Sequence, residues 1–372
     1  MRLGLRELRR RPGRFTTAAA TLTLVAALVM VLGGLLDGLI DGSTSALRAQ
    51  DADLVVYSRT ARNSLPLSEI DADLRSAVEQ ADGVAETGGI GVAQLGARLP
   101  DAEPRELVSV VLFGYELAPD GVPEPPGPGE AYADTALRSE GVEEGTQLAL
   151  GPARVPVRVV GFVEGLRYSG EATLWAEPAT WREVVAANRP DAALGDQSFQ
   201  ALLVRVADHH RPGDVAAAID ATTDSATETL TLAEAIDAIP GVREQTSTFN
   251  QIIGVTVAVG GVVVALFFAL LTVERLDLYS VLKALGARDR TLLAGVVAQA
   301  VVVTLVACAL AATGALGLDR ALPEGGVPLV VTPRRIVTST VLLLAASAAG
   351  CAFSLRRVLR VDPATAIGAT TP

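Results

Sequence analysis

The side chains of this chain that could do chemistry are few, and their spacing does not favour catalysis. The two histidines, His209 and His210, are adjacent, and two neighbours in one turn lack the further ligands that a metal ion needs. The single lysine, Lys283, does not follow the glycine-rich loop that binds ATP in a Walker motif. We therefore expect no catalytic, cofactor-binding or metal-binding residue in this chain.

The remaining reactive groups have simpler explanations. Cys308 and Cys351 both fall within long apolar runs, where a thiol packs as a small apolar group. Acidic pairs such as Glu143 with Glu144 lie in an acidic region and are expected to be solvated surface. The arginines before the first apolar run are better explained by anionic lipid heads than by nucleic acid, so we expect no nucleic-acid partner.

The sharpest functional pattern is the segment from Glu274 to Ala287. Its apolar residues recur at spacings of three and four positions, which places them on one face of a helix. These residues are Leu278, Val281, Leu282 and Leu285. The charged residues Glu274, Asp277 and Lys283 lie largely off that face, and Gly286 can end the helix. Such a helix suits two roles equally, a contact for a cytoplasmic partner or an interfacial helix that lies flat on lipid.

Four long apolar runs surround this segment, and none of them contains Asp, Glu, Lys or Arg. The runs are Phe15 to Leu36, Ile252 to Val273, Leu292 to Leu318 and Ile336 to Phe353. About 20 helical residues at about 1.5 Å each cross a hydrocarbon layer about 30 Å thick. Each run is therefore long enough, or nearly so, to span a membrane.

The arginines near both ends of the chain predict its orientation. By the positive-inside rule, the arginines that flank the first and fourth runs hold both termini in the cytoplasm. They are Arg2, Arg6, Arg9, Arg10, Arg11 and Arg14 at the start and Arg356, Arg357 and Arg360 near the end. Arg320, Arg334 and Arg335 before the fourth run argue weakly for the opposite orientation, although Asp319 and Glu324 offset part of their charge. The first run is longer than the roughly 7–15 apolar residues of a signal peptide, so we expect a retained anchor.

A large acidic region separates the first two runs and alternates between strand and helix patterns. Strand patterns cover residues 54–57, 107–113, 155–163 and 199–206, and helical patterns cover 67–82, 179–188, 214–221 and 231–241. The Pro- and Gly-rich residues 119–129 form a connector. The sequence thus predicts an α-helical membrane protein with four transmembrane helices and an α+β extracytoplasmic domain inserted between helices 1 and 2.

This layout divides the chain into nine segments. We expect a cytoplasmic amphipathic entry helix at 1–14, transmembrane helix 1 and its stalk at 15–50, the extracytoplasmic core domain at 51–242, a stalk and transmembrane helix 2 at 243–273, a cytoplasmic coupling helix at 274–290, transmembrane helix 3 at 291–318, an outer loop at 319–335, transmembrane helix 4 at 336–354 and a cytoplasmic tail at 355–372.

The segment from Glu274 to Ala287 resembles the coupling region of FtsX-like permeases, the MacB/LolC superfamily of ABC transporters. Similar sequences there begin with Glu-Arg, continue as a helix of apolar and charged residues and end in Lys-x-Leu-Gly-Ala. Three other stretches agree: the arginine-rich residues 5–14 before the first span, residues 130–164 in the inserted domain, and Val-Asp-Pro-Ala at 361–364. The resemblance spans essentially the whole chain, and the order of the stretches makes it specific.

The resemblance implies a permease subunit of the bacterial inner membrane that is not itself an enzyme. Such a subunit works as a dimer, in contact with membrane lipid, beside a separate ATPase that binds the ATP, so no cofactor is expected here. The implied contact with the ATPase consists of Glu274, Arg275, Leu278, Val281, Leu282, Lys283, Leu285 and Gly286. The implied task is export or extraction of a lipophilic, peptide or lipoprotein cargo, whose identity the sequence does not give.

Two questions stay open in the sequence. The same layout suits a receptor or scaffold that signals across the membrane or regulates a cell-wall hydrolase, and a neighbouring ATPase gene would favour the transporter instead. Glycines in the first two spans could allow close helix approach at a dimer interface, or they could be ordinary small residues. These glycines are Gly33, Gly34, Gly38, Gly254, Gly260 and Gly261.

Overall fold

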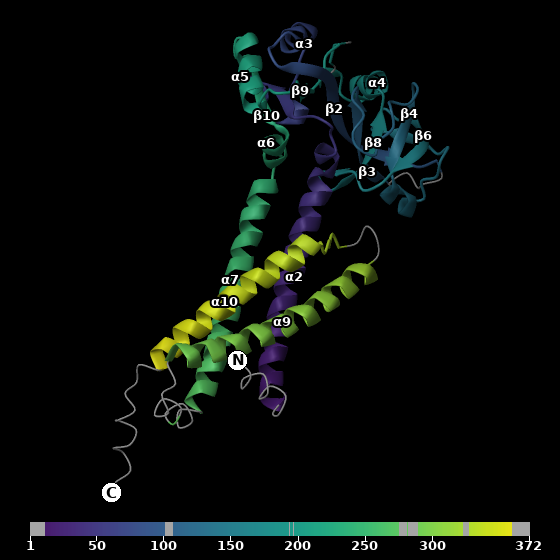
Figure 1. The fold of residues 1–372 in the computed structure, drawn as a ribbon. Helices are drawn as coiled ribbons and strands as arrows, with labels where there is room; N and C mark the ends of the chain where they lie inside the picture. Colours follow the sequence, from purple (N-terminus) through teal and green to yellow (C-terminus); the bar gives the residue numbers. More distant parts are fainter. Residues whose placement is uncertain are drawn as a thin grey trace. The chain divides into compact units, whose positions relative to one another are not determined.

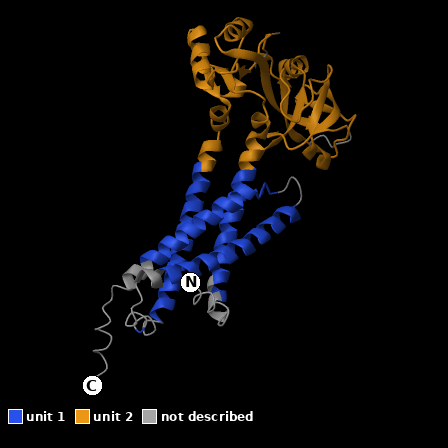
Figure 2. Ribbon diagram, viewed as in Figure 1, with its two compact units in different colours: residues 1–38, 247–372 blue, residues 39–246 orange. Residues whose placement is uncertain are grey.

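The computed structural model describes residues 12–100, 107–192, 194–195, 197–274, 281, 289–322 and 327–358 (Figure 1). The chain divides into two compact units, which Figure 2 colours separately. We call residues 1–38 with 247–372 the membrane unit, and residues 39–246 the sheet unit. The division falls inside helix α2, Pro12–Arg48, and inside helix α7, Val242–Val273.

The membrane unit contains most of α2 and α7 together with α9, Asp289–Ala321, and α10, Pro333–Val358. In the described part of the chain, four helical stretches are long and apolar enough to cross a membrane. They are Ala19–Arg48, Val242–Val273, Ala294–Ala321 and Pro333–Phe353. The prediction of four transmembrane helices is thereby confirmed in number and order.

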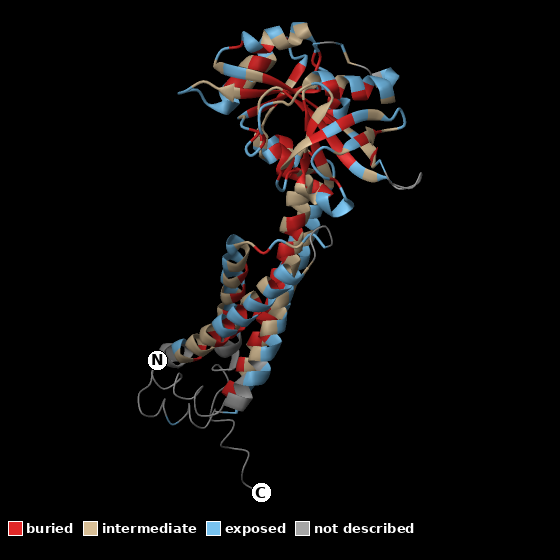
Figure 3. Ribbon diagram, turned by 90° about the vertical axis from the view of Figure 1, so that its right-hand side faces the viewer, coloured by how far each residue is buried: buried red, intermediate tan, exposed pale blue. Residues whose placement is uncertain are grey.

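The helices of the membrane unit pack through apolar and small residues. Val264 and Phe268 of α7 are buried in one cluster with Ala300 of α9. A buried hydrogen bond of 3.1 Å runs from the hydroxyl of Thr304 on α9 to that of Ser347 on α10. Many large apolar side chains on these helices remain exposed, as the pale segments in Figure 3 indicate, which suits helices that face lipid.

The sheet unit holds ten strands and several short helices. The strands are β1 Leu54–Ser58, β2 Val84–Arg98, β3 Val108–Tyr115, β4 Glu130–Asp134, β5 Gln147–Leu150, β6 Val155–Val163, β7 Arg167–Tyr168, β8 Glu171–Ala176, β9 Ala201–Val206 and β10 Thr227–Thr231. The helices are η1 Arg59–Ala61, η2 Leu65–Leu67, α3 Ala72–Glu79, η3 Thr135–Glu140, α4 Pro178–Asn188, η4 Pro190–Ala192, α5 Pro212–Thr222 and α6 Leu232–Asp237. This mixture confirms the predicted α+β class of the inserted domain.

One continuous sheet connects these strands in the order β10-β1-β9-β2-β3-β8-β4-β6-β5, with β7 paired to β8. The pairings are antiparallel except for β3 with β8 and β4 with β6, which are parallel. Because the end of β2 also pairs with β5, strands β2, β3, β8, β4, β6 and β5 form a closed ring. The long strand β2 therefore belongs to the ring at one end and to the open sheet with β9 at the other.

Aromatic side chains fill both sides of this sheet. Trp175 stacks on Phe113 with ring centroids 4.4 Å apart, in the cluster that also buries the end of α2. Trp181 of α4 lies parallel to the ring of Phe199 in a second cluster. The chain has only these two tryptophans, and both are fully buried in the sheet unit. Intrinsic tryptophan fluorescence therefore reports the unfolding of this unit.

Glycines in β2 and β3 make room for the aromatic layer. A Cβ at Gly91 would overlap the indole ring of Trp181, and a Cβ at Gly114 would lie 2.5 Å from the Cβ of the same residue. A Cβ at Gly89 would likewise overlap the ring of Phe199. The absence of side chains at these positions lets α4 and its neighbours lie directly on the strands.

We expect Gly91→Ala to lower the free energy of unfolding of the sheet unit by about 1–3 kcal/mol, because overpacking against Trp181 forces a backbone or rotamer shift. The measurement is urea denaturation of the purified full-length chain, followed by tryptophan fluorescence. Gly213→Ala is the matched control, since nothing lies within 4 Å of its Cβ position in α5. Equal midpoints for the two variants would contradict the steric argument.

Candidate functional site

The predicted coupling segment lies between the end of α7 at Val273 and the start of α9 at Asp289. Glu274 is described, and its backbone N–H donates to the carbonyl of Leu270 at 3.0 Å. Val281 is also described, is helical and is 58% exposed. The other predicted contact residues, Arg275, Leu278, Leu282, Lys283, Leu285 and Gly286, lie outside the described residues. The ATPase contact therefore stays a prediction.

The three glycines of α2 face residues of the same chain that precede and begin α10. A Cβ at Gly38 would overlap the carbonyl of Pro328, and one at Gly34 would lie 2.9 Å from Leu329. The backbone N–H of Val330 donates to the carbonyl of Gly34 at 3.1 Å. Gly33 lies under the side chain of Arg335. These glycines let the segment before α10 approach the α2 backbone closely.

Two of the three predicted glycines of α7 also allow close packing against other helices of the same chain. A Cβ at Gly260 would lie 2.8 Å from Val25 of α2, and one at Gly261 would lie 3.2 Å from Ala346 of α10. Gly254 is exposed, with nothing within 4 Å of its Cβ position. Five of the six predicted glycines thus have a packing role within one chain, and their contact with a second copy stays a prediction.

An ion pair joins α2 to α10 inside the membrane unit. The Nε of Arg335 donates to Oδ2 of Asp37 at 2.8 Å, and a second guanidinium nitrogen donates to Oδ1. The two side chains are only 21% and 26% exposed. Such a two-bond guanidinium–carboxylate pair is strong and directional, so it fixes where the start of α10 meets α2. Sequence reasoning missed this pair, although each residue directly flanks an apolar run.

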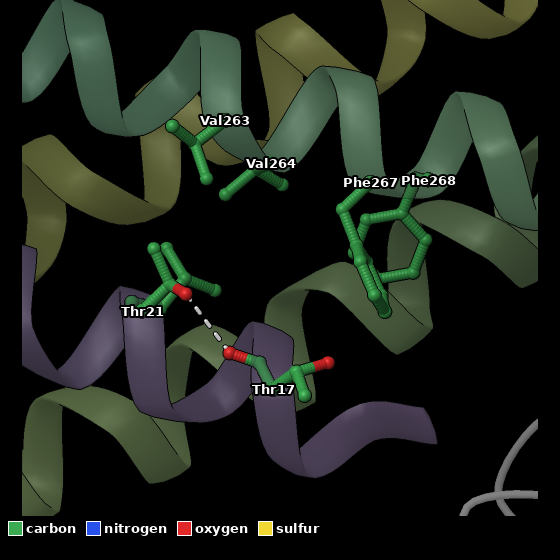
Figure 4. A pocket seen from close by; sticks show the side chains of 7 residues that line it. Thr17, Thr21, Val263, Val264, Phe267 and Phe268 are labelled. Atoms are coloured by element: carbon green, nitrogen blue, oxygen red, sulfur yellow. Dashed lines mark hydrogen bonds between the residues drawn. The ribbon is translucent and has the colours of Figure 1, made fainter.

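A small cavity lies between α2 and α7 in the membrane unit (Figure 4). Thr17 and Thr21 line it from α2, and Val264 and Phe268 line it from α7. The Thr21 hydroxyl donates to the Thr17 carbonyl at 3.0 Å, so it is satisfied within its own helix. The volume of about 120 Å³ is well below the roughly 300–1,000 Å³ of sites for drug-sized molecules. We interpret this cavity as a packing gap.

A shallow groove of about 540 Å³ lies along another face of α2. Small side chains such as Ala19, Ala20, Thr23 and Ala27 line it, with Leu310 of α9 at its border. Small residues at lipid-facing positions allow close approach of another helix. This face has the composition of a helix-packing surface.

The titratable groups of the sheet unit include one buried carboxylate, Asp134, at the end of β4. Its Oδ1 accepts the backbone N–H of Ala136 at 2.7 Å, whereas its Oδ2 is buried without a partner in the described structure. Burial raises the pKa of Asp134. The backbone N–H of Ala136, the charge of Arg167 and the backbone N–H of Leu166 oppose that rise only in part. Ionised Asp134 is therefore a cost to the folded state.

We expect Asp134→Asn to gain stability relative to the wild type as pH rises. The pKa of Asp134 is higher in the folded chain than the value of about 3.9 in an unfolded one, so the wild type loses stability from about pH 4 upward through the raised pKa. Asparagine does not ionise and escapes that loss. Tryptophan-monitored denaturation at several pH values measures it, and parallel curves for the two proteins would contradict the assignment.

The histidines and cysteines occupy structural positions. His209 has a positive φ of 74° in an exposed turn, next to His210. Cys308 and Cys351 are free thiols buried in the spans. Among the residues that the structure describes, no group of three or more His, Cys, Asp or Glu side chains could hold a metal ion.

Comparison with known proteins identifies a family domain in the C-terminal part of the chain. The family model described as FtsX-like permease C-terminal matches residues 250–363. Residues 250–363 are therefore an FtsX-like permease domain. An uncharacterized ABC transporter permease of Mycobacterium bovis is 27% identical to this chain over 379 residues, which cover 98% of each chain. A Staphylococcus haemolyticus protein named "Putative hemin transport system permease protein HrtB" is 26% identical over 132 residues, which cover 36% of this chain and only 37% of that protein.

Two solved structures are coarsely similar to the permease. The periplasmic region of MacB from Actinobacillus actinomycetemcomitans covers 52% of this chain and 94% of its own, with 8% identity and a TM-score of 0.35. The extracellular domain of the transporter YknZ from Gram-positive bacteria covers 48% of this chain and all of its own, with 13% identity and a TM-score of 0.33.

The four apolar helices and the permease domain indicate a multi-pass membrane protein, and the sheet unit is inserted between its first two spans. The full-length relatives of the chain are named ABC transporter permeases.

Proposed function

We propose that this permease couples ATP hydrolysis by a separate cytoplasmic ATPase to movement of its extracytoplasmic domain. The observation that carries the proposal is the family match over residues 250–363, because this range contains the amphipathic segment 274–290. The ATPase binds the ATP, so the permease needs no cofactor and is not itself an enzyme. Both termini lie in the cytoplasm of a bacterial cell, as the flanking arginines predict.

Two continuous helices support a mechanical role. Leu47, near the end of α2, and Val242, at the start of α7, are both buried in the core of the sheet unit. From Val242, α7 continues without interruption for 32 residues to Val273, directly before the coupling segment. A helix of this length spans about 48 Å and resists axial compression, so a push on the segment is transmitted along it.

The cargo and the second subunit are parts of the same proposal. Export or extraction of a lipophilic, peptide or lipoprotein cargo suits four spans whose apolar runs contain no charge, because such runs offer no polar path through the bundle. The name of the partial relative in hemin transport favours the lipophilic alternative. A homodimer is supported by the small-residue groove on α2, which accommodates a second helix closely.

The test is a pull-down of the tagged permease from its native membrane in mild detergent, followed by partner identification and an ATPase assay. We expect a stoichiometric partner that hydrolyses ATP and whose activity changes when the permease is bound. Recovery of the intact permease without an ATPase would overturn the proposal. It would favour a receptor or scaffold that signals across the membrane instead.

A further inference from the structure

The edge of strand β2 is unpaired along a short stretch in the sheet unit. β2 pairs with β9 from Val84 to Ile90 and with β5 at Ala97 and Arg98. No strand of the described structure pairs with this edge between those two regions. On its other edge β2 is paired with β3 without interruption from Ile90 to Ala97. The unpaired stretch is therefore an ordered strand with one open side.

The hydrogen-bonding direction of each residue follows from neighbouring contacts. Backbone groups of successive residues in a strand point to opposite edges. The carbonyl of Gly89 accepts the N–H of Glu116 at 3.1 Å, next to β3, so odd-numbered positions face β3. The continuous register with β3 keeps this alternation intact. Even-numbered positions such as Gln94 therefore point their backbone groups to the open edge.

The two ends of the open edge are already occupied. The side-chain oxygen of Gln200 accepts the N–H of Val92 at 2.6 Å, and the carbonyl of Gly96 accepts the N–H of Gly151 at 2.9 Å. Between them, the carbonyl of Val92 and both backbone groups of Gln94 have no hydrogen-bond partner among the described residues. Gln94 is exposed, and Val92, although buried as a residue, lines the cavity over this edge together with Gln94.

The edge is open because the chain that precedes β9 turns away from β2. Phe199 exchanges two backbone hydrogen bonds with Ile70, of 2.8 and 3.0 Å, instead of extending β9 along β2. Proteins usually cover or charge an exposed strand edge, because it pairs readily with another chain. Here β9 and β5 bound the open stretch on either side and a cavity lies over it, which leaves room for a short segment only.

A cavity of about 290 Å³ lies over this edge, with Val92 to Leu95 along one side. Residues 66–69 line a second side, and Asn188, Arg189 and Leu194, at and after the end of α4, line a third. Leu67 is 75% exposed and offers an apolar contact at the rim. The volume is at the lower end of the roughly 300–1,000 Å³ of ligand pockets, which suits a few residues of extended chain.

We propose that this cavity binds an extended peptide segment, which adds to β2 as a short strand between β9 and β5. The peptide donates to the Val92 and Gln94 carbonyls and accepts the Gln94 N–H, while one apolar side chain packs on Leu67 and Leu194. At about 3.4 Å per residue, the open stretch from Val92 to Gly96 is about 14 Å long. It therefore accommodates about three to five residues of extended peptide. Main-chain hydrogen bonds give such binding its affinity, and side-chain contacts give its selectivity.

The first experiment pans a displayed library of random peptides against the full-length permease in lipid nanodiscs, with empty nanodiscs as the reference. The affinity of an enriched peptide is then measured by fluorescence anisotropy. Gln94→Pro removes the outward N–H without removing a bond to β3, and it should weaken binding about tenfold or more. Gln94→Ala keeps the backbone groups and should bind like the wild type. The same peptide with every amide N-methylated should not bind.

Three further measurements make the result decisive. Tryptophan fluorescence establishes whether Gln94→Pro is folded, and Leu67→Asp changes an exposed wall residue without touching the strand. Hydrogen exchange of the wild type should show protection of the Gln94 amide when peptide is added. Failure to enrich any peptide, or binding that is equal in wild type and folded Gln94→Pro, would overturn the proposal. Binding needs no ATPase, so this result is independent of the proposed transport function.

Discussion

Asp37→Ala is expected to lower the stability of the membrane unit by about 2–4 kcal/mol, because it leaves the guanidinium of Arg335 partly buried without its carboxylate. The two hydrogen bonds to Asp37 hold the start of α10 against α2, and the Arg335 side chain also covers Gly33. The measurement is SDS titration of the purified protein in mild detergent, followed by helical circular dichroism. The sheet unit, followed through its tryptophans, should unfold at its wild-type midpoint.

Asp41→Ala is the matched control on the same helix. Asp41 pairs with Arg48 at 3.2 Å, but both side chains are about half exposed, so we expect a loss below about 1 kcal/mol. A double-mutant cycle supplies the second criterion. Asp37→Ala and Arg335→Ala together should lower the free energy of unfolding by less than the sum of the two single changes. The reason is that the double variant leaves no partly buried charge without its partner. Additive costs would mean that the pair contributes no mutual stabilisation.

The four spans could be predicted from sequence because each depends on one local property. A run of about 20 uncharged apolar residues is sufficient to cross a bilayer whatever its neighbours are. The ion pair between Asp37 and Arg335 has no such local signature, since its partners are 298 positions apart. Each residue flanks an apolar run, and taken alone it resembles any charged residue at the end of a transmembrane helix. Only the packing of α2 on the segment before α10 brings the two together.

In the inserted domain as well, the elements that depend on local sequence could be predicted and those that depend on tertiary contacts could not. The Val- and Leu-rich strands β1, β3, β6 and β9 were predicted close to their observed bounds, because β-branched and apolar residues favour strands. The longest strand, β2, was not predicted, since its several glycines lower strand propensity. Those glycines are explained by tertiary packing, because Gly89 and Gly91 lie against the rings of Phe199 and Trp181.

The start of helix α3 also differs from the sequence prediction. The apolar spacing predicts a helix over residues 67–82, whereas α3 covers Ala72–Glu79. The side chain of Asp71 accepts the N–H of Leu74 at 2.8 Å, and this N-terminal cap starts the helix. Pro66 lies in the separate turn η2 before it. The N-terminal cap therefore sets the first residue of the helix, although the apolar spacing continues on the N-terminal side of it.

Leu282→Asp is expected to abolish co-purification of the ATPase while leaving membrane insertion intact. Leu282 belongs to the apolar stripe predicted for segment 274–287, and a carboxylate in the centre of a closed contact would be buried without a partner, at a cost of several kcal/mol. That cost exceeds what a short helix contact can offset. The measurement is the ratio of ATPase to tagged permease after a pull-down from membranes, with membrane extraction confirming insertion.

Val327→Asp is the control, because it adds the same charge at an exposed position before α10, outside the coupling segment. The pull-down ratio of this variant should match the wild type. The competing role of the segment, an interfacial helix on lipid, predicts a different pattern. A charge in the stripe would then loosen the segment from the bilayer surface, and the ATPase would still be recovered with Leu282→Asp. Unchanged co-purification would therefore assign this stripe to lipid and move the ATPase contact to another part of the cytoplasmic surface.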